Sequence, residues 1–354
     1  MTAFLEIKGR RIGPGQPVYV VAELSANHNR DFDRAARLIE AAQSAGADAV
    51  KLQTYTADAL TIPCDAPQFR ISGGTPWDGR TLHDLYAEAA MPWEWQPRLK
   101  EIAEGLGLHL FSTAFDPAAV DFLEGMAVPV HKAASFEITD LALIGKMART
   151  GKPLILSTGL ATLDEIRDAV STARDAGARQ IALLRCASAY PARPEDMNLR
   201  MIPDLGATFG LPVGLSDHTL GREAAVAAVA LGACIVEKHL TLSRAVPGVD
   251  SAFSMEPHEF RTLVEAIRTV EKSLGNVYYG ATEGEEKSRV FRRSLFVVED
   301  VRKGDLFTGT NVRAIRPGQG LAPKHLSEVL GQRAARDVAR GTPLAWDLVQ
   351  REGG

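Results

Sequence analysis

The sequence predicts a (β/α)8 (TIM) barrel followed by a small C-terminal domain, an α/β fold class. Eight short apolar runs alternate with helical patterns up to Gly275, as in a parallel sheet built from βα units. This alternation stops after Gly275. Neither a G-x-G-x-x-G nor a G-x-x-x-x-G-K-[ST] motif occurs, which excludes the usual dinucleotide-binding and P-loop folds. Eight units in about 260 residues fit a closed barrel better than an open sheet.

The expected strands are short, apolar and end in polar residues. They cover residues 19–23, 49–53, 108–113, 128–132, 154–158, 181–186, 213–217 and 234–239. Amphipathic stretches such as 33–46 and 163–177 lie between them, and each ends in a glycine that can terminate a helix. A final helix over 257–275 completes the eighth unit and the catalytic barrel, residues 1–275.

Two segments depart from this rhythm. The second βα connection, roughly 54–92, is too long for a structural loop, and its Trp77, Asp78, Arg80 and Tyr86 mix aromatic and polar groups as a small-molecule pocket does. Disorder is the alternative for this segment. Residues 276–290 are expected to form a linker, and 291–354 a domain of short strands, glycine turns and one brief helix. So small a core is marginal alone, so we expect this domain to pack on something larger.

Composition narrows the class of protein. The 40 Lys and Arg residues nearly balance 44 Asp and Glu, a formal net charge of −4, which argues against binding to nucleic acid through a basic surface. Three widely spaced cysteines without a C-x-x-C pair favour a reducing compartment and no structural zinc. Without a signal-peptide core or a membrane-length apolar stretch, a cytoplasmic protein with no membrane contact is expected.

Polar residues gather where the expected strands end, which in such a barrel is the face that carries the active site. By strand alternation, Lys51 and Gln53 share one face of their strand, as do Glu237 and His239, while Lys238 points the other way. The strand-end residues are Glu23, Lys51, Gln53, Ser112, Thr113, Lys132, Ser135, Ser157, Thr158, Ser188, Tyr190, Ser216, His218, Glu237 and His239.

Two histidines indicate a metal site. His218 and His239 follow consecutive strands and can approach one ion, and with only two nitrogen ligands among oxygens a labile divalent ion such as Mn²⁺ or Mg²⁺ fits better than structural zinc. The alternative is that each histidine only bonds the backbone. His28 and Tyr190 contact substrate or order their own loops, and the sequence does not decide between these roles. The other histidines are interpreted as structural or exposed: His83, His109, His131, His258 and His325.

Two lysines, Lys51 and Lys132, follow apolar strand residues and are expected to be buried, so each needs an anion. A salt bridge to Glu23 or Glu237 is one solution. The other is an anionic substrate group, phosphate or carboxylate, held by the lysines with nearby hydroxyls. A Schiff-base lysine is a third reading, which a metal in the same site makes less necessary.

The strand-end strings resemble the sialic acid synthase family of phosphoenolpyruvate-dependent nonulosonate synthases. The strings AELSANHN, KLQTYT, FSTAFD, KAASFEITD, LSTGLAT, SAYP, GLSDHTLG, EKHLTLSR, GVDSAFS and RPGQGL stand in the family's order over nearly the whole chain. The tail resembles the family's antifreeze-like (SAF, β-clip) domain, which implies a domain-swapped homodimer. ELSANHN, WDGRTLHDLY, PWEW and SFEITD are most similar to the branch that makes pseudaminic acid from phosphoenolpyruvate and the amino-sugar aldose 2,4-diacetamido-2,4,6-trideoxy-L-altrose.

This resemblance implies a role for each site residue. His218 and His239 would bind the metal, Mn²⁺, Mg²⁺ or Co²⁺, and Glu23 would be an acid/base group beside Glu237. Ser188 stands where the sialic acid enzymes have Asn, which favours a sugar other than N-acetylmannosamine. Phosphoenolpyruvate would be held by Lys51, Thr113, Lys132, Ser135, Ser157 and Ser216, and the sugar and metal region would be lined by Gln53, Tyr190, Glu237 and Asp250, with Arg316 from the other subunit.

Other functions stay open from the sequence. The same chemistry on another sugar would give N-acetylneuraminic or legionaminic acid. A metal-dependent pyruvate aldolase would release no phosphate and would have less need of two strand-end lysines. A non-catalytic ice- or carbohydrate-binding protein would leave the polar strand ends unexplained.

Overall fold

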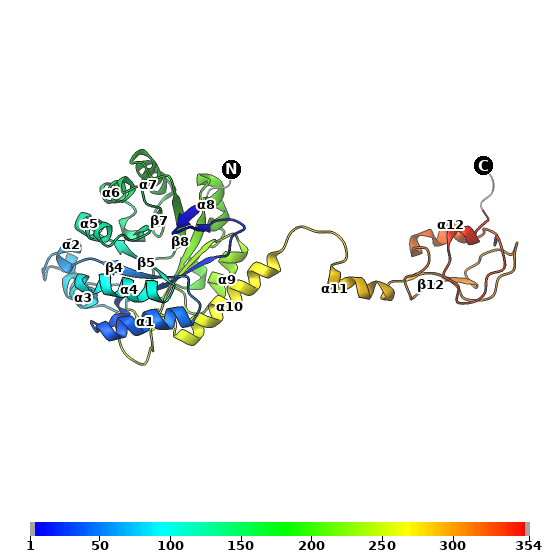
Figure 1. The fold of residues 1–354 in the computed structure, drawn as a ribbon, viewed down its shortest axis with the longest axis horizontal. Helices are drawn as coiled ribbons and strands as arrows, with labels where there is room; N and C mark the ends of the chain where they lie inside the picture. Colours follow the sequence, from blue (N-terminus) through cyan, green and yellow to red (C-terminus); the bar gives the residue numbers. More distant parts are fainter. Residues whose placement is uncertain (1–3, 351–354) are drawn as a thin grey trace. The chain divides into compact units, whose positions relative to one another are not determined.

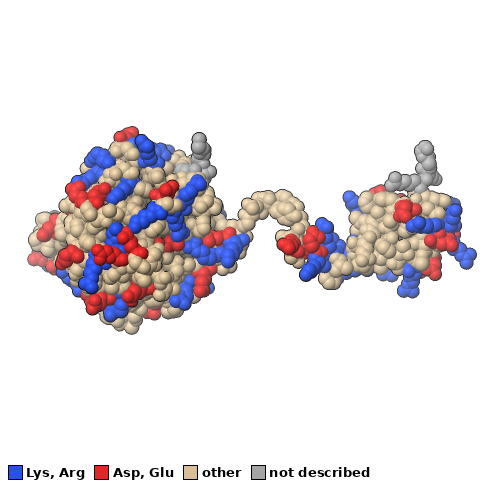
Figure 2. All heavy atoms as spheres, viewed as in Figure 1, with Lys and Arg blue, Asp and Glu red and all other residues tan. Residues whose placement is uncertain are grey.

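The computed structural model describes residues 4–350 and divides into two compact units, one up to Gly275 and one from Asn276 onward (Figure 1). Figure 2 shows Lys and Arg intermixed with Asp and Glu over the visible face of the first unit, in keeping with the near-balanced charge. No helix among the described residues is long and apolar enough to span a membrane.

Eight parallel strands close into a barrel in the first unit, which confirms the predicted fold class. The strand order is β10-β3-β4-β5-β6-β7-β8-β9, so each strand neighbours its successor in the chain and the last pairs with the first. Nearly every strand residue is buried, because the helices cover one face and the barrel core the other. The strands are β3 (Tyr19–Glu23), β4 (Ala49–Thr54), β5 (His109–Ala114), β6 (His131–Ala133), β7 (Leu154–Ser157), β8 (Ile181–Cys186), β9 (Val213–Asp217) and β10 (Ile235–His239).

The barrel helices begin at recognisable capping residues. Thr162 and Glu165 form a capping box at the start of one helix, and the Asp31 and Asp116 side chains cap two others. Gly46 and Gly177 adopt positive φ just beyond two helix ends, as the sequence predicts. The helices are α1 (Phe32–Ser44), α2 (Ala57–Leu60), α3 (Leu82–Ala89), α4 (Gln96–Gly105), α5 (Pro117–Gly125), α6 (Leu141–Arg149), α7 (Leu163–Asp175), α8 (Met201–Phe209), α9 (Glu223–Ala230) and α10 (Pro257–Leu274).

An antiparallel hairpin precedes the barrel, and the sequence did not predict it. Its strands, β1 (Leu5–Ile7) and β2 (Arg10–Ile12), are three residues each, too short to show a period-2 pattern. Leu5, Ile7 and Ile12 are fully buried in the barrel's own hydrophobic core. The hairpin therefore belongs to the first unit.

The second unit has a hydrophobic core of its own. Strand β11 (Ser294–Val297) pairs antiparallel with β12 (Val312–Ile315), and a single helical turn, α12 (Leu326–Val329), follows. The predicted linker is not wholly irregular, because it contains α11 (Glu283–Glu286) and most of a 3-10 turn, Lys287–Phe291. The core is formed by Leu295, Val297, Val301, Phe307, Val312, Val329, Ala334, Val338, Leu344, Leu348 and Val349.

Candidate active site

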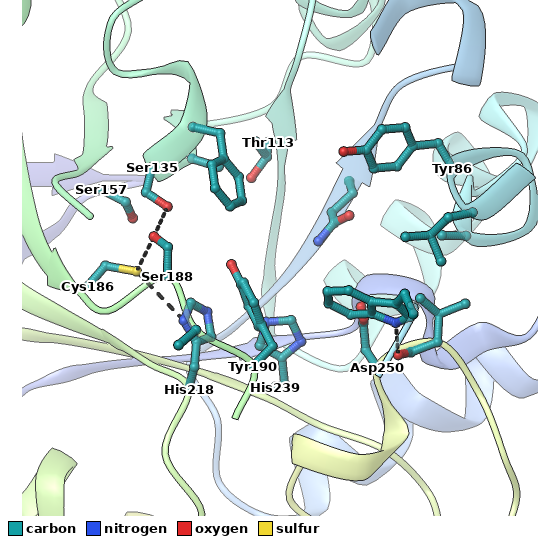
Figure 3. A pocket seen from close by; sticks show the side chains of 18 of the residues that line it. Tyr86, Thr113, Ser135, Ser157, Cys186, Ser188, Tyr190, His218, His239 and Asp250 are labelled. Carbon is teal, nitrogen blue, oxygen red and sulfur yellow. Dashed lines mark hydrogen bonds between the residues drawn. The ribbon is translucent and has the colours of Figure 1, made fainter. Parts of the chain in front are cut away.

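A cavity of about 920 Å³ opens at the carboxyl ends of the barrel strands (Figure 3). Seven of the eight barrel strands contribute a side chain to its lining, because parallel strands all end at the same rim. The strand residues that line it are Lys51, Gln53, Thr113, Lys132, Ser157, Cys186, Ser216, Glu237 and His239, and loop residues Ser135, Ser188, Tyr190, His218 and Asp250 join them.

Strand alternation decides which charged side chains reach the cavity. Glu237 and His239 face it, whereas Lys238 between them does not line it, as the alternation predicts. The Lys238 Nζ donates to Asp217 Oδ2 at 2.7 Å and to the Thr219 carbonyl at 2.7 Å. Both charged groups of this pair are buried, so Lys238 is already satisfied within the protein.

Lys51 is the paired lysine of the cavity. Its Nζ lies 2.5 Å from Glu23 Oε2 and 3.6 Å from Glu237 Oε1, and it donates to Thr113 Oγ1 at 3.1 Å. Burial opposes the charge on Lys51, but the two carboxylates hold its pKa above the usual range. Burial raises the pKa of Glu23 to about 7, and Lys51 opposes that rise. Glu23 is fully buried and touches the lining residues Lys51 and Gln53 rather than lining the cavity itself.

Lys132 is the unpaired lysine of the cavity. Its Nζ donates to Ser157 Oγ at 2.6 Å and to the Ala133 carbonyl at 3.0 Å, and within residues 4–350 no carboxylate forms a salt bridge with it. The residue is only 1% exposed, and burial lowers its pKa below the usual range. A buried cation without a salt bridge is costly, so an anion bound at this end of the cavity would stabilise Lys132.

Several serine hydroxyl groups line the same cavity as Lys132. Ser135 and Ser188 are hydrogen-bonded through their Oγ atoms at 2.8 Å, and Ser216 donates to Glu237 at 2.9 Å. Figure 3 shows Ser135, Ser157 and Ser188 together on one side of the cavity. Gly159 passes so close that a β-carbon there would collide with Ser135 and Ser188. The backbone thus leaves room for this group of serines, which offer donors to a phosphate or carboxylate.

The two histidines lie side by side, as neighbouring strand ends require, with ring centroids 5.3 Å apart. His218 Nδ1 donates to the Ala187 carbonyl at 2.9 Å, since a carbonyl only accepts, so Nε2 carries the lone pair whenever this ring is neutral. His239 Nδ1 is buried and has no hydrogen-bond partner within the described chain. Burial lowers the pKa of His239 well below its usual range, which favours the neutral, ligating form.

This donor set fits a divalent ion that keeps open positions. Within residues 4–350 no three His, Cys, Asp or Glu side chains gather into a metal-binding group, so the pair would need water or substrate oxygens to complete coordination. A closed tetrahedral zinc site does not fit two nitrogen ligands.

Aromatic rings enclose the histidines. Tyr190 packs on His218 with ring centroids 4.4 Å apart, and Phe253 packs on His239 at 5.1 Å. Trp77 packs on Tyr190 at 5.9 Å and donates from Nε1 to the Val249 carbonyl at 3.0 Å. The Tyr190 ring lines the cavity, a position compatible with contact to a substrate, which was one of the two roles left open by the sequence.

Asp250 lies next to this aromatic wall. It accepts a hydrogen bond from the Ala26 backbone at 3.3 Å, and burial raises its pKa to about 6. Figure 3 places it near His239 and Tyr190.

Sequence reasoning missed Glu137. This residue ends the 3-10 turn Ser135–Glu137 and lines the cavity, and its Oε2 is buried without a hydrogen-bond partner among the described residues. Burial raises the pKa of Glu137 to about 7, against the opposing effect of Lys132. The available signal was its place two residues after Ser135, in the loop that follows β6, the fourth barrel strand.

Of the four residues of the long connection predicted to form a pocket, two line the cavity and two do not. Trp77 and Tyr86 of the long connection line the cavity, but Asp78 caps its own turn at Gly74 and Thr75, and Arg80 pairs with Glu88. These two polar residues therefore organise the connection.

Three further residues have other surroundings. His28 is buried against Trp95 and does not line the cavity. The Ser112 Oγ is hydrogen-bonded to Thr54 Oγ1 at 2.6 Å, and Ser112 does not line the cavity. Arg316 is exposed on the second unit, and its predicted role in another subunit's site stays a prediction.

These features define a class of protein. It is a (β/α)8 barrel whose cavity is lined both by a buried lysine without a salt bridge and by two neighbouring histidines that could bind a metal. Comparison with known proteins makes the class specific. The NeuB family model matches residues 38–279 and the SAF domain model matches residues 292–350. The chain belongs to the NeuB family.

Several relatives are synthases of sugar acids. A pseudaminic acid synthase from Helicobacter pylori is 45% identical over 95% of this chain and 99% of its own length. An N,N'-diacetyllegionaminic acid synthase from Legionella pneumophila is 35% identical over 96% of each chain. The crystal structure of an N-acetylneuraminic acid synthetase from Leptospira borgpetersenii superposes with a TM-score of 0.73 at 31% identity, over 81% of this chain and 95% of that one.

Proposed function

We propose that this protein is a pseudaminic acid synthase, a transferase that joins phosphoenolpyruvate to 2,4-diacetamido-2,4,6-trideoxy-L-altrose and releases phosphate. The observation that carries the proposal is the cavity itself, where unpaired Lys132 and a group of serines face the same space as the histidine pair. The higher identity to pseudaminic than to legionaminic acid synthases supports the choice of sugar.

Phosphoenolpyruvate would lie at the charged end of the cavity. Its phosphate would satisfy Lys132, with Ser157 and Ser135 donating hydrogen bonds, and Lys51 with Thr113 and Ser216 would complete the cradle. Because these donors are already in place, they would stabilise the charge that builds on phosphate as it leaves.

The sugar would lie beside the histidines. His218 and His239 would hold Mn²⁺, Mg²⁺ or Co²⁺, which when bound supplies Lewis-acid polarisation of the sugar's aldehyde. Tyr190 and Phe253 would exclude water from this region and fix both imidazoles. Gln53, Ser188 and Asp250 would bind the sugar's hydroxyl and amide groups.

The reaction balances with one water. C3 of phosphoenolpyruvate forms a bond to the aldehyde carbon, the aldehyde oxygen takes a proton, and water adds at C2 and loses a proton. The C2–O bond to phosphate then breaks, its electron pair leaves with the phosphate, and the C2 hydroxyl gives up its proton to the departing phosphate as the ketone forms. Glu137 would make these proton transfers, since it lines the cavity and its raised pKa lets it exchange protons near neutral pH. Glu23, assigned this role from the resemblance, would instead act through Lys51.

The second unit would complete the site from another subunit. Arg316 is exposed on this unit, and we propose that in a homodimer it reaches the partner's barrel and binds the sugar's acetamido side. Mixing Arg316→Ala with Lys132→Met should restore some activity, because hybrid dimers would contain one intact site. No restoration would assign Arg316 to its own barrel or to no site.

A phosphate-release assay with phosphoenolpyruvate and each candidate aldose tests the proposed function. The trideoxy altrose should give turnover that N-acetylmannosamine and the legionaminic acid precursor do not match. Preference for either of those would reassign the sugar. Condensation with pyruvate and no phosphate release would identify an aldolase, and no binding of phosphoenolpyruvate would revive a non-catalytic role.

A further inference from the structure

One wall of the cavity, formed by the β4–α3 connection, helix α3 and the loops after β5 and β10, is apolar. Six of its side chains both line the cavity and belong to, or pack against, a hydrophobic cluster separate from the barrel core: Tyr55, Leu60, Tyr86, Ala89, Phe115 and Val249. Figure 3 shows Tyr86 on the side opposite Ser135 and Ser157. The cavity therefore has a charged half, with the lysines and serines, and an apolar half.

The apolar half is held in a fixed shape. The Tyr55 ring packs edge-on against Tyr86 at 6.0 Å and against Phe115 at 5.1 Å. Trp77 Nε1 donates a hydrogen bond to the carbonyl of Val249, one of the six residues of this wall. A wall supported in this way can discriminate by shape and polarity, because it does not need to be ordered when a ligand binds.

We infer that the apolar half is a specificity subsite for the non-reacting end of the acceptor, C4 to C6, and that it selects a 6-deoxy sugar with a C4 acetamido group over a congener with a C6 hydroxyl. This inference rests on the proposed function. The aldehyde at C1 must lie beside C3 of phosphoenolpyruvate in the charged half, so the other end of the open-chain sugar extends toward the apolar wall.

The chemistry of the substituents matches that wall. The C6 methyl and the methyl of the C4 acetamido group gain by leaving water, whereas a C6 hydroxyl would lose its hydrogen bonds to water against Leu60 and Phe115. The Tyr86 hydroxyl, directed toward the cavity in Figure 3, can hydrogen-bond to the amide of the C4 acetamido group. A hydrophobic pocket rejects an added hydroxyl by a factor on the order of 10².

The test compares kcat/KM for the trideoxy altrose and for its 6-hydroxy congener by phosphate release. Wild type should prefer the 6-deoxy sugar by 10- to 100-fold. Leu60→Asn, similar in shape but polar, should reduce that ratio at least fivefold, while Leu60→Met should retain it. Ile62→Asn is the matched control, because Ile62 is two residues away, 56% exposed and not part of the lining. The KM for phosphoenolpyruvate should stay within twofold in all three variants.

The outcomes separate the two proposals. No wild-type turnover of the trideoxy altrose would overturn the proposed function before any variant is made. Turnover of that sugar with an unchanged ratio in Leu60→Asn would overturn the inference alone, as would an equal fall of the ratio in Ile62→Asn. Thermal unfolding of each variant checks that the barrel is folded.

Discussion

The two ends of the barrel differ in how completely their charged groups are paired. At the amino-terminal end, Asp48 accepts from Arg10 at 2.5 Å and from Arg268 at 3.1 Å, and Glu271 accepts from Arg268 at 2.8 Å. At the mouth, Lys132 has no carboxylate partner, and buried atoms of Glu137 and His239 have no hydrogen-bond partner within the described chain.

This contrast distinguishes polar groups that stabilise the fold from polar groups that await a ligand. Groups at the amino-terminal end satisfy one another, so their removal should be felt as lost stability. Lys132, Glu137 and His239 at the mouth are buried with incomplete pairing, which is a cost to folding that a bound ligand can relieve. Substitutions at the two ends should therefore separate stability from activity.

Removing the metal should have the largest effect on activity. If His218 and His239 hold the ion, exhaustive chelation should lower phosphate release at least about 10³-fold, since a Lewis acid supplies several kcal/mol. Adding Mn²⁺ should restore the rate, and His218→Ala should resist this restoration. Turnover that survives chelation would show that the reaction does not require a metal.

Lys132→Met should come next. Loss of one preorganised donor for the departing phosphate should lower kcat/KM about 10²- to 10³-fold. Stability should stay the same or rise, because an unpaired buried charge is removed. The matched control is Lys238→Met, which leaves buried Asp217 unpaired and should destabilise the fold by about 3–5 kcal/mol. Equal destabilisation by both substitutions, measured by denaturant unfolding, would show that Lys132 is structural.

Glu137→Gln should change the pH dependence of both activity and stability. The folded protein keeps the Glu137 proton up to the raised pKa of about 7, whereas the unfolded chain loses it near 4.5. Its stabilising contribution is thus present below pH 4.5 and lost as the pH rises toward 7. The wild-type minus variant difference in unfolding free energy should fall over that window and then level off.

The rate of the same variant should fall 10- to 100-fold and lose the limb of the kcat/KM profile near pH 7. A variant that keeps this limb would return the proton-transfer role to another group, with Glu23 the first candidate.

Asp48→Asn at the amino-terminal end should affect activity least. It weakens the ion pairs with Arg10 and Arg268, so unfolding should become easier by about 1–3 kcal/mol. The kcat of the folded enzyme should change less than twofold. A large loss of kcat at full folding would mean that the two ends are coupled.

Much of this arrangement could be predicted from the sequence. The eight strands were visible because strands buried on both faces read as apolar runs, and their polar last residues had to meet at one rim. The alternation of Glu237, Lys238 and His239 even indicated which side chain would point away.

Other features depend on contacts between distant parts of the chain. Lys51 and Lys132 look alike in the sequence, and only the barrel geometry brings Glu23 to the first and leaves the second unpaired. The β1–β2 hairpin was too short to have a pattern. Glu137 was missed because it lies beyond Ser135 on the turn after β6, where no strand alternation indicates the direction of a side chain.

Direct binding of phosphoenolpyruvate, measured by isothermal titration calorimetry, tests the central claim that the unpaired lysine at the mouth is its phosphate site. Wild type should bind phosphoenolpyruvate, and Lys132→Met should bind it at least about 100-fold more weakly while Asp48→Asn binds it as wild type does. An unchanged Kd in Lys132→Met would contradict the account.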